Sequence, residues 1–321
     1  MLKKAIAVVT SGGDSPGMNA AARAVVRTAI YEGVDVYGVH NGYSGMVHDD
    51  IEKLTTRSVS DLIQRGGTFL GTARSKSFMT PEGRRTAFEN LRKHGIEGLV
   101  IIGGDGSLTG GSLLSKETGM PIVGLPGTID NDVWGMDYTI GCDTACNTIV
   151  DAINKLRDTA SAHRRIILVE VMGRHSGWLA MMSGIAGGAE YILVPEVAYD
   201  LEEISCDLKE MYEAGKRYSI IVVAEGAGSA VEIGKIIREK TEIDTRVSVL
   251  GHIQRGGSPT VEDRIKASML GEKAALAIIS GVNDVIFSFN EGQVVSVNLF
   301  EAVNNTKTLD PELVRLSRVL A

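Results

Sequence analysis

The chain has 321 residues, of which 44% are hydrophobic and 23% charged, with a formal net charge of -7. This composition is typical of a globular protein of about two domains, and without a basic stripe it argues against nucleic-acid binding. Three cysteines without CxxC spacing exclude a disulfide framework or zinc site, and no apolar run is long enough to span a membrane, so we expect a cytoplasmic protein.

Short apolar runs rich in β-branched residues recur along the chain and predict buried strands. They lie at 5–9, 98–102, 120–125, 165–172, 191–194, 219–224 and 246–250. Helical periodicity is found at 18–32, 82–94, 143–160, 201–214 and 261–279. This alternation is typical of βαβ units, and no low-complexity linker separates them. We therefore expect an α/β protein whose two domains are closely docked, each a mostly parallel sheet flanked by helices.

Glycine-rich segments with a polar or charged residue follow most of these runs. They are VVTSGGDSPG at 8–17, VIIGGDGS at 100–107, GLPGTIDND at 124–132, EVMGRHSG at 170–177, VAEGAG at 223–228 and VLGHIQRGG at 249–257. Glycine alone explains why a strand ends, but not the acids, arginines and histidine beside it. Open α/β sheets bind ligands at the carboxyl ends of their strands, so the segments predict one site built from many loops.

The first of these segments predicts phosphate binding. Gly12 and Gly13 allow the backbone to approach a ligand closely. The alanine-rich helix expected next presents N-terminal N–H groups, which favour phosphate. The segment is neither the P-loop GxxxxGK[ST] nor the dinucleotide fingerprint GxGxxG.

The second segment combines an anion cradle with a carboxylate. Gly104 and Gly106 flank Asp105, and Ser107 is expected to cap the next helix. A lone carboxylate repels phosphate unless a cation lies between them, and Mg²⁺ bridges carboxylates and phosphate oxygens. Asp105 is therefore the predicted metal residue, with an ordinary helix-start residue as the alternative. A third glycine loop at 66–78 carries Arg74, and together these loops suit a nucleotide polyphosphate better than a dinucleotide.

Residues 124–135, GLPGTIDNDVWG, end an apolar run and expose two carboxylates. A surface turn is one reading, because Pro, Gly, Asn and Asp are common in turns. Phosphoryl transfer offers another, since it needs a carboxylate to accept the proton of the substrate hydroxyl. On that reading Asp130 is the base, Thr128 contacts the moving phosphoryl group, and Asp132 holds the substrate or a water on the metal.

Arginines at the later strands predict an anionic acceptor. Arg165 and Arg246 precede or begin two strands, whereas Arg174 and Arg255, with His252, follow the ends of the same strands. The two ends of such a strand lie about 20 Å apart. Either some of these arginines are surface residues, or a second subunit of a symmetric oligomer contributes its own.

The motifs TSGGDSPGMNAA, GGTFLGTAR, IIGGDGS, GLPGTIDND, VEVMGRHSG and VLGHIQRGGSP together resemble the bacterial ATP-dependent 6-phosphofructokinases, in order from residue 3 to about 290. The resemblance implies a homotetramer that converts fructose 6-phosphate and ATP to fructose 1,6-bisphosphate and ADP with Mg²⁺. It implies a larger, ATP-binding domain of residues 1–138 and 251–300, and a smaller, sugar-phosphate-binding domain of residues 139–250 and 301–321. The last thirty residues are less informative.

The resemblance also implies roles for individual residues. The ATP site comprises Gly13, Arg74, Ser75, Gly104, Asp105, Gly106 and Ser107, with Asp105 on Mg²⁺. Catalysis falls to Asp130, Thr128 and Arg174. The sugar-phosphate contacts are Thr128, Ile129, Asp130, Asp132, Met172, Gly173, Arg174, Glu225, His252 and Arg255, with Arg165 and Arg246 from the neighbouring subunit. The effector site shared between subunits comprises Arg23, Arg27, Arg157, Gly188, Glu190 and Lys216.

Two features bear on the donor and the effector. Pyrophosphate-using relatives typically carry Asp at the position of Gly106 and Lys at that of Gly127, so the two glycines favour ATP. Arg57, Ala214 and Tyr218 depart from the family pattern at the effector site, which predicts weak or altered activation by ADP.

Three alternatives remain open. One is a pyrophosphate-dependent phosphofructokinase, and another is a lipid or nicotinamide-dinucleotide kinase that shares the GGDG turn. The third is a non-catalytic sensor of nucleotides or sugar phosphates. The presence of both Asp130 and Asp105 argues against the sensor.

Overall fold

The structure, a computed structural model, describes residues 5–321. These residues divide into two compact units. Unit 1 contains the chain up to Thr144 and Arg255–Lys307, and unit 2 contains Ala145–Gln254 and Thr308–Ala321. The boundaries expected after residues 138, 250 and 300 lie a few residues before the ends of these segments.

Unit 1 is built, within residues 5–321, on a seven-stranded sheet in the order β11-β10-β5-β4-β1-β2-β3. Its strands are β1 (Ala5–Ser11), β2 (Asp35–Val39), β3 (Ile51–Lys53), β4 (Ile96–Gly103), β5 (Ile122–Pro126), β10 (Val285–Asn290) and β11 (Gln293–Asn298). The inner strands are parallel, and the edge strands β3 and β11 are antiparallel to their neighbours. The carboxyl ends of β1, β4 and β5 therefore meet at one edge of the sheet.

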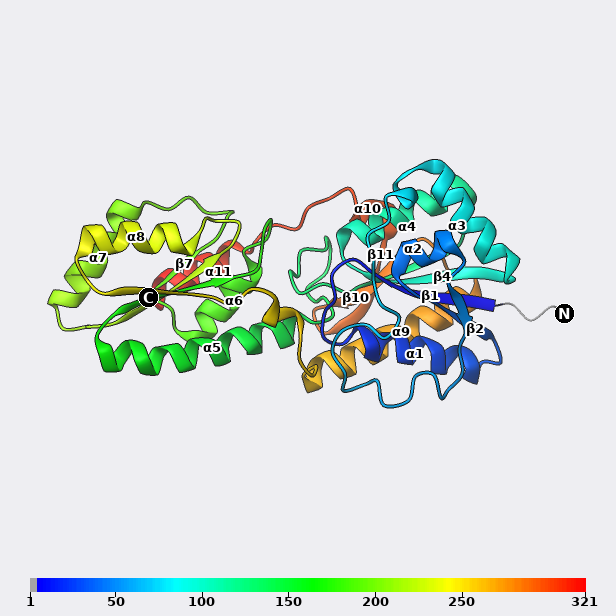
Figure 1. Cartoon of the computed structure of the whole chain (residues 1–321), viewed down its shortest axis with the longest axis horizontal. Coiled ribbons are helices and arrows are strands. Elements are labelled where there is room, and N and C mark those ends of the chain that lie inside the picture. Colours follow the sequence, from blue (N-terminus) through cyan, green and yellow to red (C-terminus); the bar gives the residue numbers. More distant parts are fainter. Residues whose placement is uncertain (1–4) are drawn as a thin grey trace. The chain divides into compact units, whose positions relative to one another are not determined.

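Helices cover both faces of this sheet (Figure 1). They are α1 (Met18–Tyr31) and α9 (Val261–Ser280), which pack together on one face, with α2 (Gly42–His48), α3 (Pro81–Lys93), α4 (Asp105–Thr118) and the short α10 (Leu299–Ala302). Ala5, Ala7 and Val9 of β1 lie in the core beneath α2–α4. Ile6 lies beside Ile278 of α9 on the other face. Strand β1 is thus buried on both faces, as its unbroken apolar run predicts.

Unit 2 is built on a sheet that is four-stranded in the described chain, in the order β7-β8-β6-β9. Its strands are β6 (Ile166–Val171), β7 (Tyr191–Leu193), β8 (Ser219–Ala224) and β9 (Thr245–Val249), and all are parallel. Its helices are α5 (Cys142–His163, which begins in unit 1), α6 (Trp178–Gly187), α7 (Leu201–Glu213), α8 (Ala230–Thr241) and α11 (Pro311–Val319). Apolar residues of the sheet pack with α7 and α8 in one core.

The predicted fold class is confirmed: both sheets are mostly parallel, and helices flank them. Each predicted strand and helix is present, with ends shifted by at most three residues. In residues 5–321 no helix is both long and apolar enough to cross a bilayer.

Candidate active site

A cavity of about 270 Å³ lies at the carboxyl edge of the unit 1 sheet. Its lining residues come from the loops after β1, β4 and β5 and from the segment before α9. They are Gly12, Gly13, Gly104, Asp105, Gly106, Ser107, Gly127, Thr128, Asp130, Asp132 and Arg255. All of these residues except Gly12 and Gly127 are predicted ATP, catalytic or sugar-phosphate residues, and they come from four separate motifs that the fold brings together.

The N-terminus of α4 forms one wall of the cavity. The helix begins at Asp105, and Gly104 stands at its cap position with an extended backbone. Ser107 lies inside the helix and its carbonyl accepts a hydrogen bond from Tyr43, so the expectation that Ser107 caps the helix is wrong. The helix starts three residues earlier than expected, which places its free N–H groups around Gly104–Ser107. Such a helix start favours a bound phosphate.

Arg255 lies against the glycine loop after β1. Its Nη1 donates a hydrogen bond to the carbonyl of Asp14 at 3.2 Å. A Cβ on Gly13 would stand 2.9 Å from Cζ of Arg255 and nearer still to Nη1, so any other residue there would displace the guanidinium from this position. This contact adds a positive charge to the cavity, beside the bare amides of the loop.

Asp130 and Thr128 share one tight turn after β5. The amide of Asp130 donates to Oγ1 of Thr128 at 3.3 Å, so the hydroxyl hydrogen of Thr128 is available to another acceptor. Thr128 is buried and Asp130 half-buried, while Ile129 between them is fully buried in the core. The side chain of Ile129 therefore cannot contact a ligand in the cavity, and only its backbone is placed to do so.

Three carboxylates line the cavity within reach of each other's charge. Burial, and to a lesser extent the charges of Asp130 and Asp105, raise the pKa of Asp132 to about 6. Burial also raises the pKa of Asp105. Negative charge concentrated in a partly desolvated cavity is stabilised by a cation.

Mg²⁺ fits this arrangement. Within residues 5–321 no group of three or more His, Cys, Asp or Glu side chains is placed to hold a metal by itself. Mg²⁺ does not need such a cage, because it keeps several waters and binds through one or two carboxylates plus phosphate oxygens. Asp105 borders the glycine cradle and can supply the carboxylate.

Arg74 and Ser75 of the predicted ATP site do not line this cavity. Arg74 is exposed in the segment that precedes the short helix Ser77–Met79. The Ser75 hydroxyl accepts a hydrogen bond from the amide of Phe78 at 3.2 Å and so helps to shape that segment. Their part in ATP binding stays a prediction.

The remaining sugar-phosphate residues belong to unit 2, where most gather at the carboxyl edge of its sheet. Met172, Gly173 and Arg174 follow β6, and Glu225 follows its neighbour β8. The amide of Glu225 donates to Val171 at 2.9 Å, and that of Gly226 to Gly173 at 3.1 Å, so the two loops lie side by side.

Backbone geometry fixes the sharp turn between these loops. Gly173 has a φ of 130°, and a Cβ there would collide with the carbonyl of Ser176. The segment after β9, which carries His252, is tied to the same edge, because Gln254 accepts a hydrogen bond from the amide of Met172 at 3.2 Å.

Arg165 and Arg246 lie at the opposite end of this sheet. Arg165 precedes β6, and Arg246 pairs in register with Ile167. Asp244 forms ion pairs with both, at 3.4 Å to Nε of Arg165 and 3.1 Å to Nε of Arg246. The two arginines are thus neighbours, separated from Arg174 by the length of a strand, about 20 Å.

The predicted effector residues fall into three groups. Arg23 and Arg27 lie one turn apart on α1 in unit 1. In unit 2, Arg157 donates to the carbonyl of Gly188 at 2.6 Å, and Lys216 pairs with the buried Glu190 at 3.0 Å. Their joint role stays a prediction.

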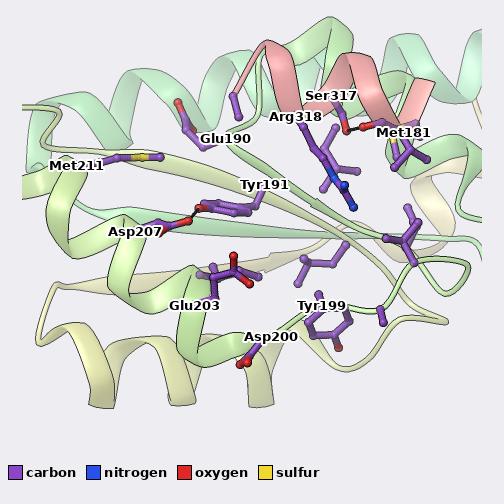
Figure 2. A pocket seen from close by; sticks show the side chains of 18 residues that line it. Met181, Glu190, Tyr191, Tyr199, Asp200, Glu203, Asp207, Met211, Ser317 and Arg318 are labelled. Carbon is purple, nitrogen blue, oxygen red and sulfur yellow. Dashed lines mark hydrogen bonds between the residues drawn. The ribbon is translucent and has the colours of Figure 1, made fainter. Parts of the chain in front are cut away.

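A larger cavity of about 640 Å³ lies in unit 2 between β7, α7 and α11 (Figure 2). Glu190 is the predicted effector residue on its wall, and its carboxylate accepts a hydrogen bond from the amide of Ile220 at 2.6 Å. Tyr191 donates to Asp207 at 2.7 Å across the same wall. The acidic wall and the lack of a glycine cradle make this cavity unlike the phosphate site of unit 1.

Comparisons with known proteins identify the family of the chain. Residues 5–278 match the family model described as Phosphofructokinase. The chain is 57% identical over 318 residues, 99% of either chain, to the ATP-dependent 6-phosphofructokinase of Bacillus licheniformis, and 54% identical over the same share to that of Bacillus thuringiensis.

Among solved structures, phosphofructokinase from Saccharomyces cerevisiae is similar with a TM-score of 0.88 and 40% identity, over 94% of this chain and 45% of that chain. The pyrophosphate-dependent phosphofructokinase from Nitrosospira multiformis has a TM-score of 0.89 at 20% identity, over 98% of this chain and 91% of that chain, which shows the fold alone. On the family match and the near full-length identity, the chain belongs to the phosphofructokinase family.

Proposed function

We propose that the chain transfers the γ-phosphoryl group of ATP to the C1 hydroxyl of fructose 6-phosphate, which gives fructose 1,6-bisphosphate and ADP. The single observation that carries this proposal is the cavity of unit 1, where a glycine cradle with Asp105 meets Thr128 and Asp130. Near full-length identity to proteins named ATP-dependent 6-phosphofructokinase supports it. The reaction is a step of glycolysis, and we infer a cytoplasmic location for it.

Each group around the cavity has a role in this reaction. Asp130 accepts the proton of the C1 hydroxyl as that oxygen attacks in line. Thr128 donates its hydroxyl hydrogen to the transferring group, and Arg174 and Arg255 neutralise the developing charge. Asp132 holds the sugar or a water. Bound Mg²⁺ supplies charge neutralisation at the transferring phosphates, with Asp105 as its protein ligand.

The choice of phosphoryl donor, ATP or pyrophosphate, is the part of this proposal that can be tested most directly. A Cβ on Gly106 would meet open space, whereas one on Gly127 would stand 3.1–3.2 Å from Met18, Gly103 and Ile102. A side chain at 106 therefore fits the folded protein and would project into the cavity that receives the nucleotide. A lysine at 127 would strain its surroundings. Both observations support ATP over pyrophosphate.

The deciding experiment is an assay of fructose 6-phosphate phosphorylation with Mg²⁺, in which ATP and pyrophosphate are compared as donors. We expect turnover with ATP alone. Turnover with pyrophosphate would be consistent with Asp130 as the base and fructose 6-phosphate as the acceptor, but it would refute ATP as the donor. The absence of turnover with both would refute catalysis and favour the sensor.

We also propose a homotetramer in which Arg165 and Arg246 reach the sugar phosphate of the neighbouring subunit. Their separation from Arg174 along β6 and β9 supports this, because one small ligand cannot contact both ends of a strand. The effector site shared between subunits binds ADP weakly, since Arg57, Ala214 and Tyr218 alter its charge and stacking surface. Strong activation by ADP at low fructose 6-phosphate would contradict this.

A further inference from the structure

Asp263 is a fully buried carboxylate outside the cavity. It lies in the first turn of α9, and among the described residues its oxygens accept four hydrogen bonds, all from the stretch 138–144. Oδ1 accepts from the Tyr138 hydroxyl and, at 2.9 Å, from the amide of Gly141. Oδ2 accepts from the amide of Thr144 at 2.8 Å and from its hydroxyl at 2.5 Å.

These bonds join the N-termini of two helices. Helix α5 begins at Cys142 and α9 at Val261. The amide of Thr260 donates to the Thr144 hydroxyl at 3.0 Å, and the Thr260 hydroxyl to Asp143 at 2.5 Å. Helix N-termini carry partial positive charge and repel one another. The carboxylates of Asp143 and Asp263 therefore offset this repulsion.

Residues 138–144, which Asp263 binds, are hydrogen-bonded in turn to two loops of the cavity. Ile140, beside Gly141, donates its N–H to the carbonyl of Pro126 at 2.8 Å, immediately before Gly127. The carbonyl of Ile140 accepts a hydrogen bond from the Ser15 hydroxyl at 2.7 Å, and Ser15 follows the Gly12–Gly13 loop. Ile140 is thus hydrogen-bonded to both the segment before Gly127 and the segment after the Gly12–Gly13 loop.

Asn131 adds a second connection to the same stretch. It lies between the two aspartates of the cavity and is 1% exposed, with a φ of 49°. Its side-chain amide donates to the carbonyl of Asp137 at 2.9 Å. The backbone around Asp130 and Asp132 therefore rests on residues 137–140, next to the groups that Asp263 binds.

We propose that Asp263 is a positioning residue for phosphoryl transfer. By fixing residues 138–144 it sets the place of Asp130 and Asp132 relative to the glycine cradle. The cradle at Gly104–Ser107 belongs to α4 and is not held by these bonds. The inference rests on the proposed role of Asp130 as the base.

The test is the steady-state kinetics of Asp263→Asn in the full-length protein. The asparagine keeps one oxygen acceptor, so its NH2 would face the N–H group of either Gly141 or Thr144 with a donor instead of an acceptor. We expect kcat to fall about 100-fold, because displacement of a reacting group by about 1 Å costs that much. The KM for MgATP should stay within about threefold. The assay is run well below the unfolding temperature, with circular dichroism and oligomeric state matched to wild type.

A double-mutant cycle with Ser15→Ala separates positioning from general destabilisation. Both side chains act on Ile140 and its neighbours, so the losses in kcat should not multiply. Multiplicative losses, or a kcat of Asp263→Asn within threefold of wild type, would overturn the inference.

Thr144 supplies a matched pair in case Asp263→Asn does not fold. Thr144→Val removes the hydroxyl that binds Asp263 and Thr260, and we expect kcat to fall about three- to tenfold. Thr144→Ser keeps the hydroxyl and should remain within twofold of wild type. Equal kinetics in the two variants would refute the inference.

Asp130→Ser is assayed beside these variants to separate the two proposals. An active Asp130→Ser protein would refute the assignment of Asp130 as the general base. An inactive Asp130→Ser protein with fully active Asp263→Asn would refute only the positioning role.

Discussion

Asp130 is the residue on which the proposed chemistry depends most directly. It borders the cavity, and its backbone is fixed by the turn it shares with Thr128. Asp130→Ser should lower kcat by about 10²–10⁴-fold, the usual contribution of a general base, and change the KM for fructose 6-phosphate far less. Steady-state kinetics of the variant would check this, and a loss of activity below threefold would contradict the assignment.

The raised pKa of Asp132 predicts that the stability of the ligand-free protein depends on pH. Its pKa is raised from 3.8 to about 6 in the folded protein, mainly by burial. The native state therefore holds this proton more tightly than the unfolded state. The stabilisation of the native state that comes from binding this proton is greatest below pH 4, and it is lost as the pH rises through 6.

Asp132→Asn should consequently raise the free energy of unfolding at pH 7.5 by about 1–2 kcal/mol, less than the full shift would give, because Asp132 is half-buried. Urea denaturation of both proteins at pH 5 and pH 7.5 measures the difference. Glu97→Gln, at an exposed position of β4, serves as the control and should show no gain. An equal gain at both pH values would show that the burial argument is wrong.

The residues of the unit 1 cavity could be predicted from the sequence, whereas those that support it could not. Gly13, Asp105 and Asp130 each follow a buried strand, and parallel strands bring such residues to one edge. Asp263 carries no comparable signal. Thr260 caps α9 and accepts a hydrogen bond from the Asp263 amide, so in the sequence Asp263 resembles an ordinary first-turn acid. Its partners lie more than a hundred residues away.

Helix α4 illustrates how packing can override local propensity. Its sequence contains Gly106, Gly110 and Gly111, and glycine lowers helix propensity, so helical periodicity does not mark this helix even though a cap at Ser107 is expected. A Cβ on Gly110 would stand 2.8 Å from the Tyr43 ring, and one on Gly111 would overlap Ile101. The glycines therefore allow α4 to pack closely against α2 and β4. Four strands of the unit 1 sheet are missed from the sequence. Of these, β3 and β11 lie at the sheet edges, where no continuous apolar run marks them, and β2 and β10 lie next to them.

The ion pair between α3 and α4 lets us predict how much the free energy of unfolding falls when one contact between two helices is lost. Arg84 is buried and forms a fork with Glu117, with its Nε and Nη2 at 2.7 and 2.6 Å from the two carboxylate oxygens. Glu117→Gln should lower the free energy of unfolding by about 2–3 kcal/mol at pH 7, because the buried guanidinium loses its counter-charge.

The pH dependence of this loss has a definite sign. Arg84 lowers the pKa of Glu117, so the stabilisation is present at neutral pH and disappears as the pH falls below about 4. Denaturant titrations at pH 7 and pH 3.5 would measure it. Glu312→Gln breaks an exposed pair with Arg315 and should cost under about 0.5 kcal/mol. Equal losses in the two variants would contradict the role of burial.

The division into units could be predicted only in outline from the sequence. The chain passes between units after Thr144, Gln254 and Lys307, and no change of composition marks these points. Helix α5 continues through the first of them without interruption. Sequence patterns report local structure, so a boundary inside a helix leaves no signal for them.

The proposed exchange of arginines between subunits predicts complementation. Asp130→Ser and Arg246→Ala should each be nearly inactive at low fructose 6-phosphate. In a hybrid oligomer one site carries both defects and its partner site carries neither, so roughly half of the sites in such pairs regain activity.

Dissociation and reassociation of the mixed parents, followed by an activity assay, measures this recovery. The control is each parent taken through the same treatment alone. No recovery in proven hybrids would place Arg246 in the site of its own subunit or outside any site.

The order of strands in unit 1 has a consequence for how the protein is synthesised. Strand β10 pairs with β5 but follows it by about 160 residues, and α9, which covers α1, is made after the whole unit 2 sheet. A chain emerging from the ribosome can complete that second sheet while β5 still has an open edge and α1 an uncovered apolar face. Until the last sixty residues or so emerge, the nascent protein presents the surfaces that chaperones bind, and premature termination in α9 would leave them exposed permanently.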